Sequence, residues 1–383
     1  MTHKESLVPL KMMLFSFHGA NTMVISFLPL LLAYRGLSEQ EIGWVLAVGP
    51  TVSIISQPLF GYISDKFQTV KKVLLVATLG LIISSFFFFQ MEVLGVLLFS
   101  AVFFYFFSSA IAPLADSLAQ RRAKALNVPF GSIRTWGSIG FAISSLVIGQ
   151  YVDWVGIQYL FIPYGMMTIT LLLLTTRLKD VKVDTKPINF KDVGKLLRNK
   201  QFITLLLVMF LVTITHRTND SFIGLYIRQI GGRDNLVGLA WFLGVFSEAI
   251  VFMFAGKWFK KFHPLVFMII AAWLYTLRWL VYGIVADPYV LVVMQVFHGL
   301  SFGVFYVASF EYVSRLIPEH MQATGHLIFM TVFFGFSGII GSLGGGYVLE
   351  VLGGQTLYIA MGIMTIVGSL LIGVYHWFYK NSY

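Results

Sequence analysis

The chain has 383 residues, of which 57% are hydrophobic and only 11% are charged, and its mean hydropathy is +0.82. Soluble domains carry about 25% charged residues, so this composition excludes a water-soluble protein and predicts a polytopic membrane protein. The net charge of +10 would suggest nucleic-acid binding in a soluble chain, whereas in a membrane protein its distribution among the loops is what matters. There is no cysteine, which excludes disulfides, thiolate metal sites and cysteine nucleophiles.

In chain order, the apolar segments are long enough for the roughly 20 residues that a membrane-spanning helix requires. The first follows Lys4 and Lys11 and is too long for a signal peptide, so we expect it to be retained as a helix. The predicted spans are 10–34, 42–64, 73–91, 94–118, 130–152, 157–176, 202–227, 236–256, 264–284, 289–313, 323–348 and 356–378. The pattern predicts an all-α membrane protein with twelve transmembrane helices.

The charged stretch 177–200 divides the chain into an N-terminal six-helix bundle, 1–176, and a C-terminal six-helix bundle, 201–383. With the N-terminus inside, the cytoplasmic segments hold 21 of the 27 Lys and Arg residues, which predicts that both termini are cytoplasmic. The halves resemble repeats, because "FGYISDKF" and "AGKWFKKF" follow the second helix of each half and "GQYVDWVG" and "GGYVLEVLG" end the fifth. Parallel repeats of this kind predict a site between the halves near the bilayer midplane, with alternating access.

Ionisable residues inside membrane spans are costly and indicate functional sites. Asp116 and Arg134 lie in the fourth and fifth spans, each nine residues from Ala125 in the connecting hairpin. Two antiparallel helices would bring them to the same depth, since the rise per residue is equal on both sides. We expect an ion pair or two sides of a small polar cavity, in a binding role, with a purely structural salt bridge as the alternative.

The second half holds a larger constellation of polar residues. His216 and Asp220 are four residues apart on one helical face with Arg217 between them. Further along the chain, single ionisable residues interrupt the eighth, ninth and tenth spans, namely Glu248, Arg278 and His298. With Asp116 and Arg134, three carboxylates balance three arginines, and protonating one carboxylate would release its partner. His298 alone could equally be a packing histidine.

Other features are expected to be structural. Glu311 and Arg315, four residues apart, are expected to pair near the end of the tenth span, and the glycines of "GSLGGGY" at 341–347 to allow close helix approach. His18 and Asn21 could either face a cavity or bond a neighbouring helix. The sequence contains no HExxH or GxSxG motif. We therefore expect that the protein is not an enzyme and that it has no cofactor or metal site.

Over nearly its whole length the chain resembles the major facilitator superfamily, and within it the lactose-permease-like proton symporters. "PLFGYISDKF" at 58–67 is similar to the superfamily's loop motif, which implies a cytoplasmic gate at Asp65 and Lys66; "QTVKK" then departs from its usual glycine and basic residues. Asp116 and Arg134 match the principal sugar contacts of lactose permease. Phe141 stands where an aromatic residue stacks on the sugar.

The second half continues this resemblance. Arg278, His298 and Asp220 match an arginine, a histidine and an acid of lactose permease, and Glu248 stands in place of a sugar-binding asparagine. The departures concern proton coupling: Ser301 replaces the carboxylate that carries the proton. Gln295 and Phe334 replace lysines, and Arg217 replaces an acid.

From these residues and this resemblance we expect a secondary transporter that takes up a small polar metabolite together with a proton. It is expected to be a monomer, to cross the cytoplasmic (inner) membrane many times and to require no cofactor. The substrate class favoured is a sugar, oligosaccharide or glycoside. An aromatic acid, a nucleoside, proton-driven drug efflux and a non-transporting receptor remain alternatives. The expected coupling residues are Glu248 or Asp220, with Asp116 as a third candidate, and the expected substrate contacts are Asp116, Arg134, Phe141, His298, Glu248, His216 and Asn21.

Overall fold

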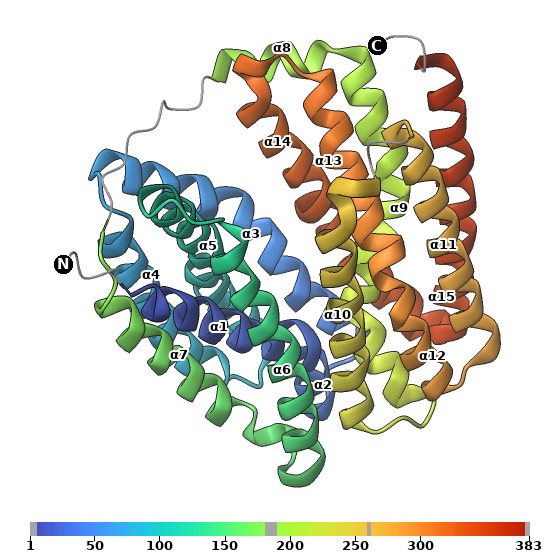
Figure 1. Ribbon diagram of the computed structural model, residues 1–383. Coiled ribbons are helices and arrows are strands. Elements are labelled where there is room, and N and C mark those ends of the chain that lie inside the picture. The colour runs from blue at the N-terminus through green and yellow to red at the C-terminus, as the bar shows by residue number, and fades with distance from the viewer. Residues whose placement is uncertain (1–5, 181–189, 259–261, 380–383) are drawn as a thin grey trace. The chain divides into compact units, whose positions relative to one another are not determined.

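The computed structural model describes residues 6–180, 190–258 and 262–379, and every regular element in them is helical (Figure 1). These residues contain eleven helical segments that are long and apolar enough to cross a membrane. The last, Thr324–Tyr379, has 56 residues, about 84 Å at 1.5 Å per residue, which far exceeds a bilayer core of about 30 Å. Gly353 breaks it with φ 81° and ψ 166°, so the predicted twelve spans are confirmed.

The chain divides into two compact units. The first comprises residues 1–37 and 44–187, and the second comprises residues 38–43 and 188–383. The predicted linker lies partly outside the described residues, as do both chain ends and part of the repeated segment 255–262. The described end of the linker is the short helix α8 (Phe190–Arg198), which the sequence analysis did not predict and which packs against α9 and α14.

In the first unit, the opening span is continuous but changes its winding. A π-helical turn, Met23–Phe27, separates α1 from α2 within the span, and such turns often occur at functional sites. The helices of this unit are α1 (Val8–Thr22), α2 (Leu28–Tyr34), α3 (Glu39–Lys66), α4 (Val70–Phe88), α5 (Leu94–Ala125), α6 (Gly131–Val155) and α7 (Phe161–Thr176).

The second unit contains the remaining spans and two further π-helical turns. These turns, Gly299–Gly303 and Thr331–Phe336, interrupt the tenth and eleventh spans close to the polar residues described below. The helices after α8 are α9 (Lys200–Gln229), α10 (Asp234–Trp258), α11 (Pro264–Val285), α12 (Pro288–Met294), α13 (Val304–Leu316), α14 (Gln322–Met330) and α15 (Ser337–Tyr379).

Glycines set the closest helix contacts in both units, as the sequence predicted for 341–347. A methyl group at Gly341 would lie 3.0 Å from the carbonyl oxygen of Ile214, and one at Gly345 would lie 2.6 Å from the Thr218 methyl, so α15 rests directly on α9. In the first unit, a methyl at Gly140 of α6 would overlap the backbone of Phe15 on α1. Without a driving force from water, such backbone approach is how membrane helices pack.

We therefore expect Gly140→Ala to destabilise the protein. Backbone of α1 cannot move aside as a flexible side chain could, so the overlap should cost about 1–3 kcal/mol. Thermal unfolding in detergent would show this loss of stability as a lower unfolding midpoint than that of the unaltered protein. Gly61→Ala is the matched control, because no heavy atom lies within 4 Å of a methyl group there. Equal midpoints for the two variants would contradict this account of the α1–α6 contact.

Candidate functional site

The first unit carries an ion pair at the depth that the hairpin spacing predicted. Nε of Arg134 on α6 lies 3.0 Å from Oδ1 of Asp116 on α5 and donates a hydrogen bond to Oδ2 at 3.2 Å. The two side chains are 32% and 36% exposed. Oδ1 itself accepts no hydrogen bond. Because Oδ1 is buried while the two side chains are each about one-third exposed, the pair is compensated in charge and partly accessible.

Helix α1 brings a third polar group to this pair. A methyl at Gly137 would lie 2.7 Å from Nη1 of Arg134 and 3.0 Å from Nε2 of His18, so the absence of a side chain there makes room for both. Nε2 of His18 has no hydrogen-bond partner. Of the other predicted contacts, Asn21 is half-buried on α1, whereas Phe141 is only 8% exposed. We call His18, Asp116 and Arg134 the N-terminal polar site.

In the second unit, three predicted residues of α9 form one ionic group. Nη1 of Arg217 donates to Oδ2 of Asp220 at 2.7 Å, and Nε2 of His216 lies 3.4 Å from the same oxygen. Spacings of three and four residues place the side chains on one face of the helix. Asp220 and His216 are buried, while the Arg217 side chain is 26% exposed and stacks near the ring of Phe334.

Glu248 and His298 join this group from other helices. Nε2 of His298, beside the π-helical turn at 299–303, lies 3.7 Å from Oε2 of Glu248 on α10. The imidazole rings of His298 and His216 are 5.7 Å apart, and Phe302 stacks on His216 at 4.3 Å. We call His216, Arg217, Asp220, Glu248, Arg278 and His298 the C-terminal polar cluster.

Arg278 differs from the other two arginines of the spans in having neutral partners. Its side chain on α11 is fully buried and donates to Oγ of Ser301 at 2.8 Å and to Oε1 of Gln295 at 2.5 Å. The ring of Trp279 lies 4.9 Å from its guanidinium carbon. In the described residues Arg278 makes no ion pair, so three arginines do not pair one-to-one with three carboxylates. Ser301 and Gln295, noted as departures from the family pattern, are the residues that hold it.

The predicted gate residues are exposed at the end of α3. Asp65 and Lys66 follow the last apolar turn, and the Lys66 ammonium lies 5.9 Å from the ring of Phe67. The sequence analysis missed Asp180 next to this region. Its carboxylate accepts hydrogen bonds from the backbone N–H groups of Val70 and Lys71 at 3.1 Å each, and so caps α4. The predicted pair of Glu311 and Arg315 is confirmed at 3.0 Å.

Membrane-spanning helices that carry paired charges in both halves are those of a polytopic membrane protein of the transporter class. Residues 7–360 match the model of the MFS_1 like family, and the chain belongs to that family. It is 31% identical over 344 residues to the maltose permease of Geobacillus stearothermophilus, covering 88% of this chain and 86% of that protein. It is 24% identical to a probable 3-phenylpropionic acid transporter of Escherichia coli, over 79% of this chain and 83% of that protein.

The fold agrees with this assignment. The solved structure of the nucleoside transporter NupG matches with a TM-score of 0.81 at 18% identity, covering 98% of this chain and 99% of that one. The predicted resemblance to lactose-permease-like members of the major facilitator superfamily is confirmed, since sucrose and lactose permeases are also relatives. The chain is a multi-pass secondary transporter.

Proposed function

We propose that this protein takes up a neutral sugar or glycoside together with a proton, by alternating access, across the cytoplasmic membrane. The observation that carries the proposal is the compensated, accessible ion pair of the N-terminal polar site. A neutral polyhydroxyl ligand can donate to Asp116 and accept from Arg134 without bringing a charge into the membrane. The similarity to maltose permease supports the same substrate class.

An aromatic acid, the alternative substrate, would favour an arginine that has no carboxylate partner. Arg278 is such an arginine, but its side chain is 0% exposed and donates to Ser301 and Gln295. Arg134 and Arg217 each lie within 3.0 Å of a carboxylate oxygen. The arrangement of charges therefore favours a neutral ligand.

Uptake into proteoliposomes tests the substrate and its direction. Purified protein would be given labelled maltose, sucrose, uridine and 3-phenylpropionate, each with and without an inward proton gradient. We expect gradient-dependent accumulation of maltose or sucrose. Accumulation of uridine or 3-phenylpropionate alone would refute a sugar substrate, and export driven by the gradient would refute uptake.

Glu248 is the proposed carrier of the coupled proton. Its side chain is 23% exposed and lies beside an imidazole, whereas Asp220 is 9% exposed and is held by the Arg217 guanidinium at 2.7 Å. Protonating Asp220 would forfeit a charge-assisted hydrogen bond, which is worth about 1.5–3 kcal/mol. Glu248 is the more exposed of the two carboxylates, which supports it as the group that exchanges a proton with water.

We therefore expect Glu248→Gln to abolish accumulation against a gradient while substrate exchange between the two sides continues, because glutamine cannot carry a proton. Counterflow and gradient-driven uptake would be measured on the same proteoliposomes. Glu311→Gln is the matched control, since that carboxylate is 46% exposed in a surface pair. A Glu248→Gln protein that still concentrates its substrate would assign the proton to another residue.

A further inference from the structure

A second binding site lies in the first unit, away from the polar residues above. It is a groove of about 400 Å³ between α4 and α7, which neighbour each other in Figure 1. Arg35, Gln90 and Gln158 line the end where α4 stops and α7 begins. Phe86, Phe161 and Ile169 belong to its apolar wall. Its polar groups thus mark a helix end and its apolar walls extend toward the middle of the spans.

Arg35 is fixed at the polar end of the groove. Its Nη1 donates to the carbonyl oxygen of Met91 at 2.9 Å, and its Nη2 donates to that of Phe89, at the C-terminal end of α4. Burial lowers the pKa of Arg35 below its ordinary value, and the nearby charge of Glu92 acts in the opposite direction. A guanidinium has five N–H donors, so donors remain for an anion. Planar, partly desolvated guanidinium groups suit phosphate oxygens.

The lining of the rest of the groove suits an apolar ligand. Its serine and threonine hydroxyls are satisfied within their helices, because Ser85 donates to the carbonyl oxygen of Ile82 and Thr168 donates to that of Tyr164 at 3.0 Å. Phe86 is 64% exposed and Ile169 is 52% exposed, which leaves apolar surface for an occupant to cover. A methyl group at Gly165 would meet no atom within 4 Å, so this glycine leaves the groove open.

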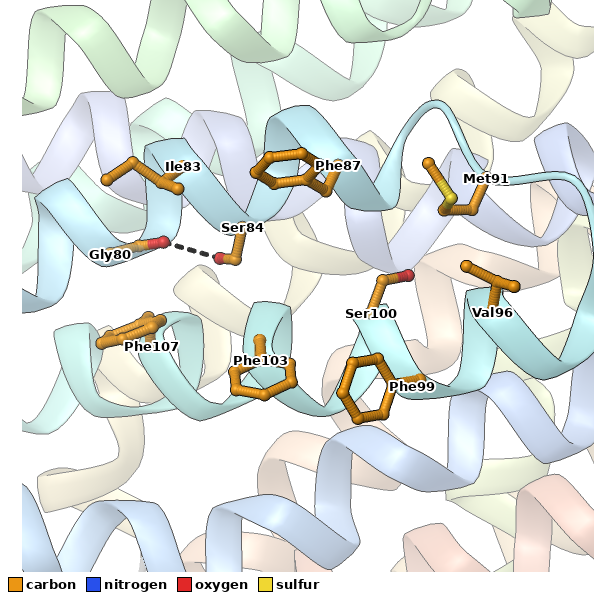
Figure 2. A pocket seen from close by; sticks show the side chains of 10 residues that line it. All are labelled: Gly80, Ile83, Ser84, Phe87, Met91, Val96, Phe99, Ser100, Phe103 and Phe107. Atoms are coloured by element: carbon orange, nitrogen blue, oxygen red, sulfur yellow. Dashed lines mark hydrogen bonds between the residues drawn. The ribbon is translucent and has the colours of Figure 1, made fainter.

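A neighbouring cavity without a charged end provides a comparison for the headgroup selectivity of the α4–α7 groove. Figure 2 shows Ile83 and Phe87 of α4 opposite Phe103 and Phe107 of α5, around a cavity of about 440 Å³. No charged residue lines it, and Ser84 donates to the carbonyl of Gly80. Any acyl chain of the bilayer could cover such a surface, without selection by headgroup. The α4–α7 groove also has an apolar wall, but it has in addition a polar end with the Arg35 cation and two glutamines.

We propose that the α4–α7 groove binds one anionic phospholipid of the surrounding bilayer, with its phosphate on Arg35 and an acyl chain along Gly165. The groove matches a phospholipid along its length: the polar residues at the helix end face the headgroup, and the apolar wall faces the acyl chain. The acyl chain is already out of water in the bilayer, so it contributes van der Waals contact with the groove wall, and the phosphate contact supplies headgroup selectivity.

Native mass spectrometry of the full chain tests the proposal. Protein in micelles with equimolar phosphatidylglycerol and phosphatidylcholine should retain one phosphatidylglycerol preferentially. Arg35→Gln should lower that preference about tenfold, the effect of losing one charge-assisted hydrogen bond. Arg35→Lys, which keeps the charge, should retain most of it. Gly165→Leu should reduce retention of either lipid, because its side chain occupies the groove.

Matched controls separate the groove from general effects. Gly373→Leu places the same side chain where no atom lies within 4 Å, outside this groove, and Arg233→Gln removes an exposed arginine that does not line the groove. Both should bind lipid as the unaltered protein does. Equal retention of both lipids by the unaltered protein, or unchanged retention in Arg35→Gln and Gly165→Leu, would overturn the proposal. Displacement of the lipid by inorganic phosphate alone would assign the site to free phosphate instead.

Discussion

Replacing Arg134 by alanine should lower the affinity for the transported sugar by about 100-fold or more. The substitution removes a cation that can donate charge-assisted hydrogen bonds, each worth about 1.5–3 kcal/mol, and every 1.4 kcal/mol is a factor of ten in affinity. It also leaves the Asp116 carboxylate without the guanidinium 3.0 Å away. Isothermal titration with the sugar identified by uptake would measure the change.

Two further variants sharpen this result. Asp116→Asn keeps the shape of the side chain but removes its charge, and should lose affinity to a similar degree. Arg134→Lys keeps the charge but cannot form the guanidinium fork, so we expect an intermediate loss. Arg315→Ala is the matched control, because it breaks an exposed pair of the same 3.0 Å separation. Ordinary sugar affinity in both Asp116→Asn and Arg134→Ala would show that the pair is structural.

The Asp116–Arg134 pair should contribute little to folding stability. Both side chains are about one-third exposed, and ion pairs accessible to solvent typically contribute up to about 1 kcal/mol. A large loss of sugar affinity with a nearly unchanged unfolding midpoint is therefore the expected signature of a binding pair.

Arg278→Ala should have the opposite signature, a large loss of stability. The Arg278 side chain is fully buried, and its removal leaves a cavity and deprives Oε1 of Gln295 of its donor. An unsatisfied buried acceptor costs about 1–3 kcal/mol, and a large-to-small substitution in a core costs about 2–5 kcal/mol. We expect about 3–8 kcal/mol in total, measured as a lower midpoint of thermal unfolding in detergent.

Controls for Arg278 come from the same unit. Arg228→Ala removes an arginine that is 35% exposed and pairs with Asp234, and should cost about 1 kcal/mol or less. Arg278→Lys should be intermediate, because one ammonium cannot reach both Ser301 and Gln295 in the geometry of a planar fork. If Arg278→Ala and Arg228→Ala unfolded at the same temperature, Arg278 would not be the anchor that its contacts indicate.

The sequence predicted whatever depends on composition and on position along a helix. The low content of charge predicts membrane spans because a charged surface could not be built from it. The equal depth of Asp116 and Arg134 follows from the equal rise per residue on the two sides of a hairpin, and the structure brings them to 3.0 Å. The glycines at 341–347 predict close approach of another helix because they have no side chain, and the structure places α9 against them.

The partners of Arg278 and the groove beside Arg35 depend instead on how each helix is rotated about its axis. Spans that are hydrophobic on all sides have no polar face from which this rotation can be read. Only packing turns Ser301 and Gln295 toward Arg278, and aligns Arg35 with the apolar walls of α4 and α7. The sequence by itself determined that this chain spans a membrane and at what depth its charges lie. Tertiary structure decided which groups meet those charges, because side-chain partners across helices are set by contacts distant in sequence.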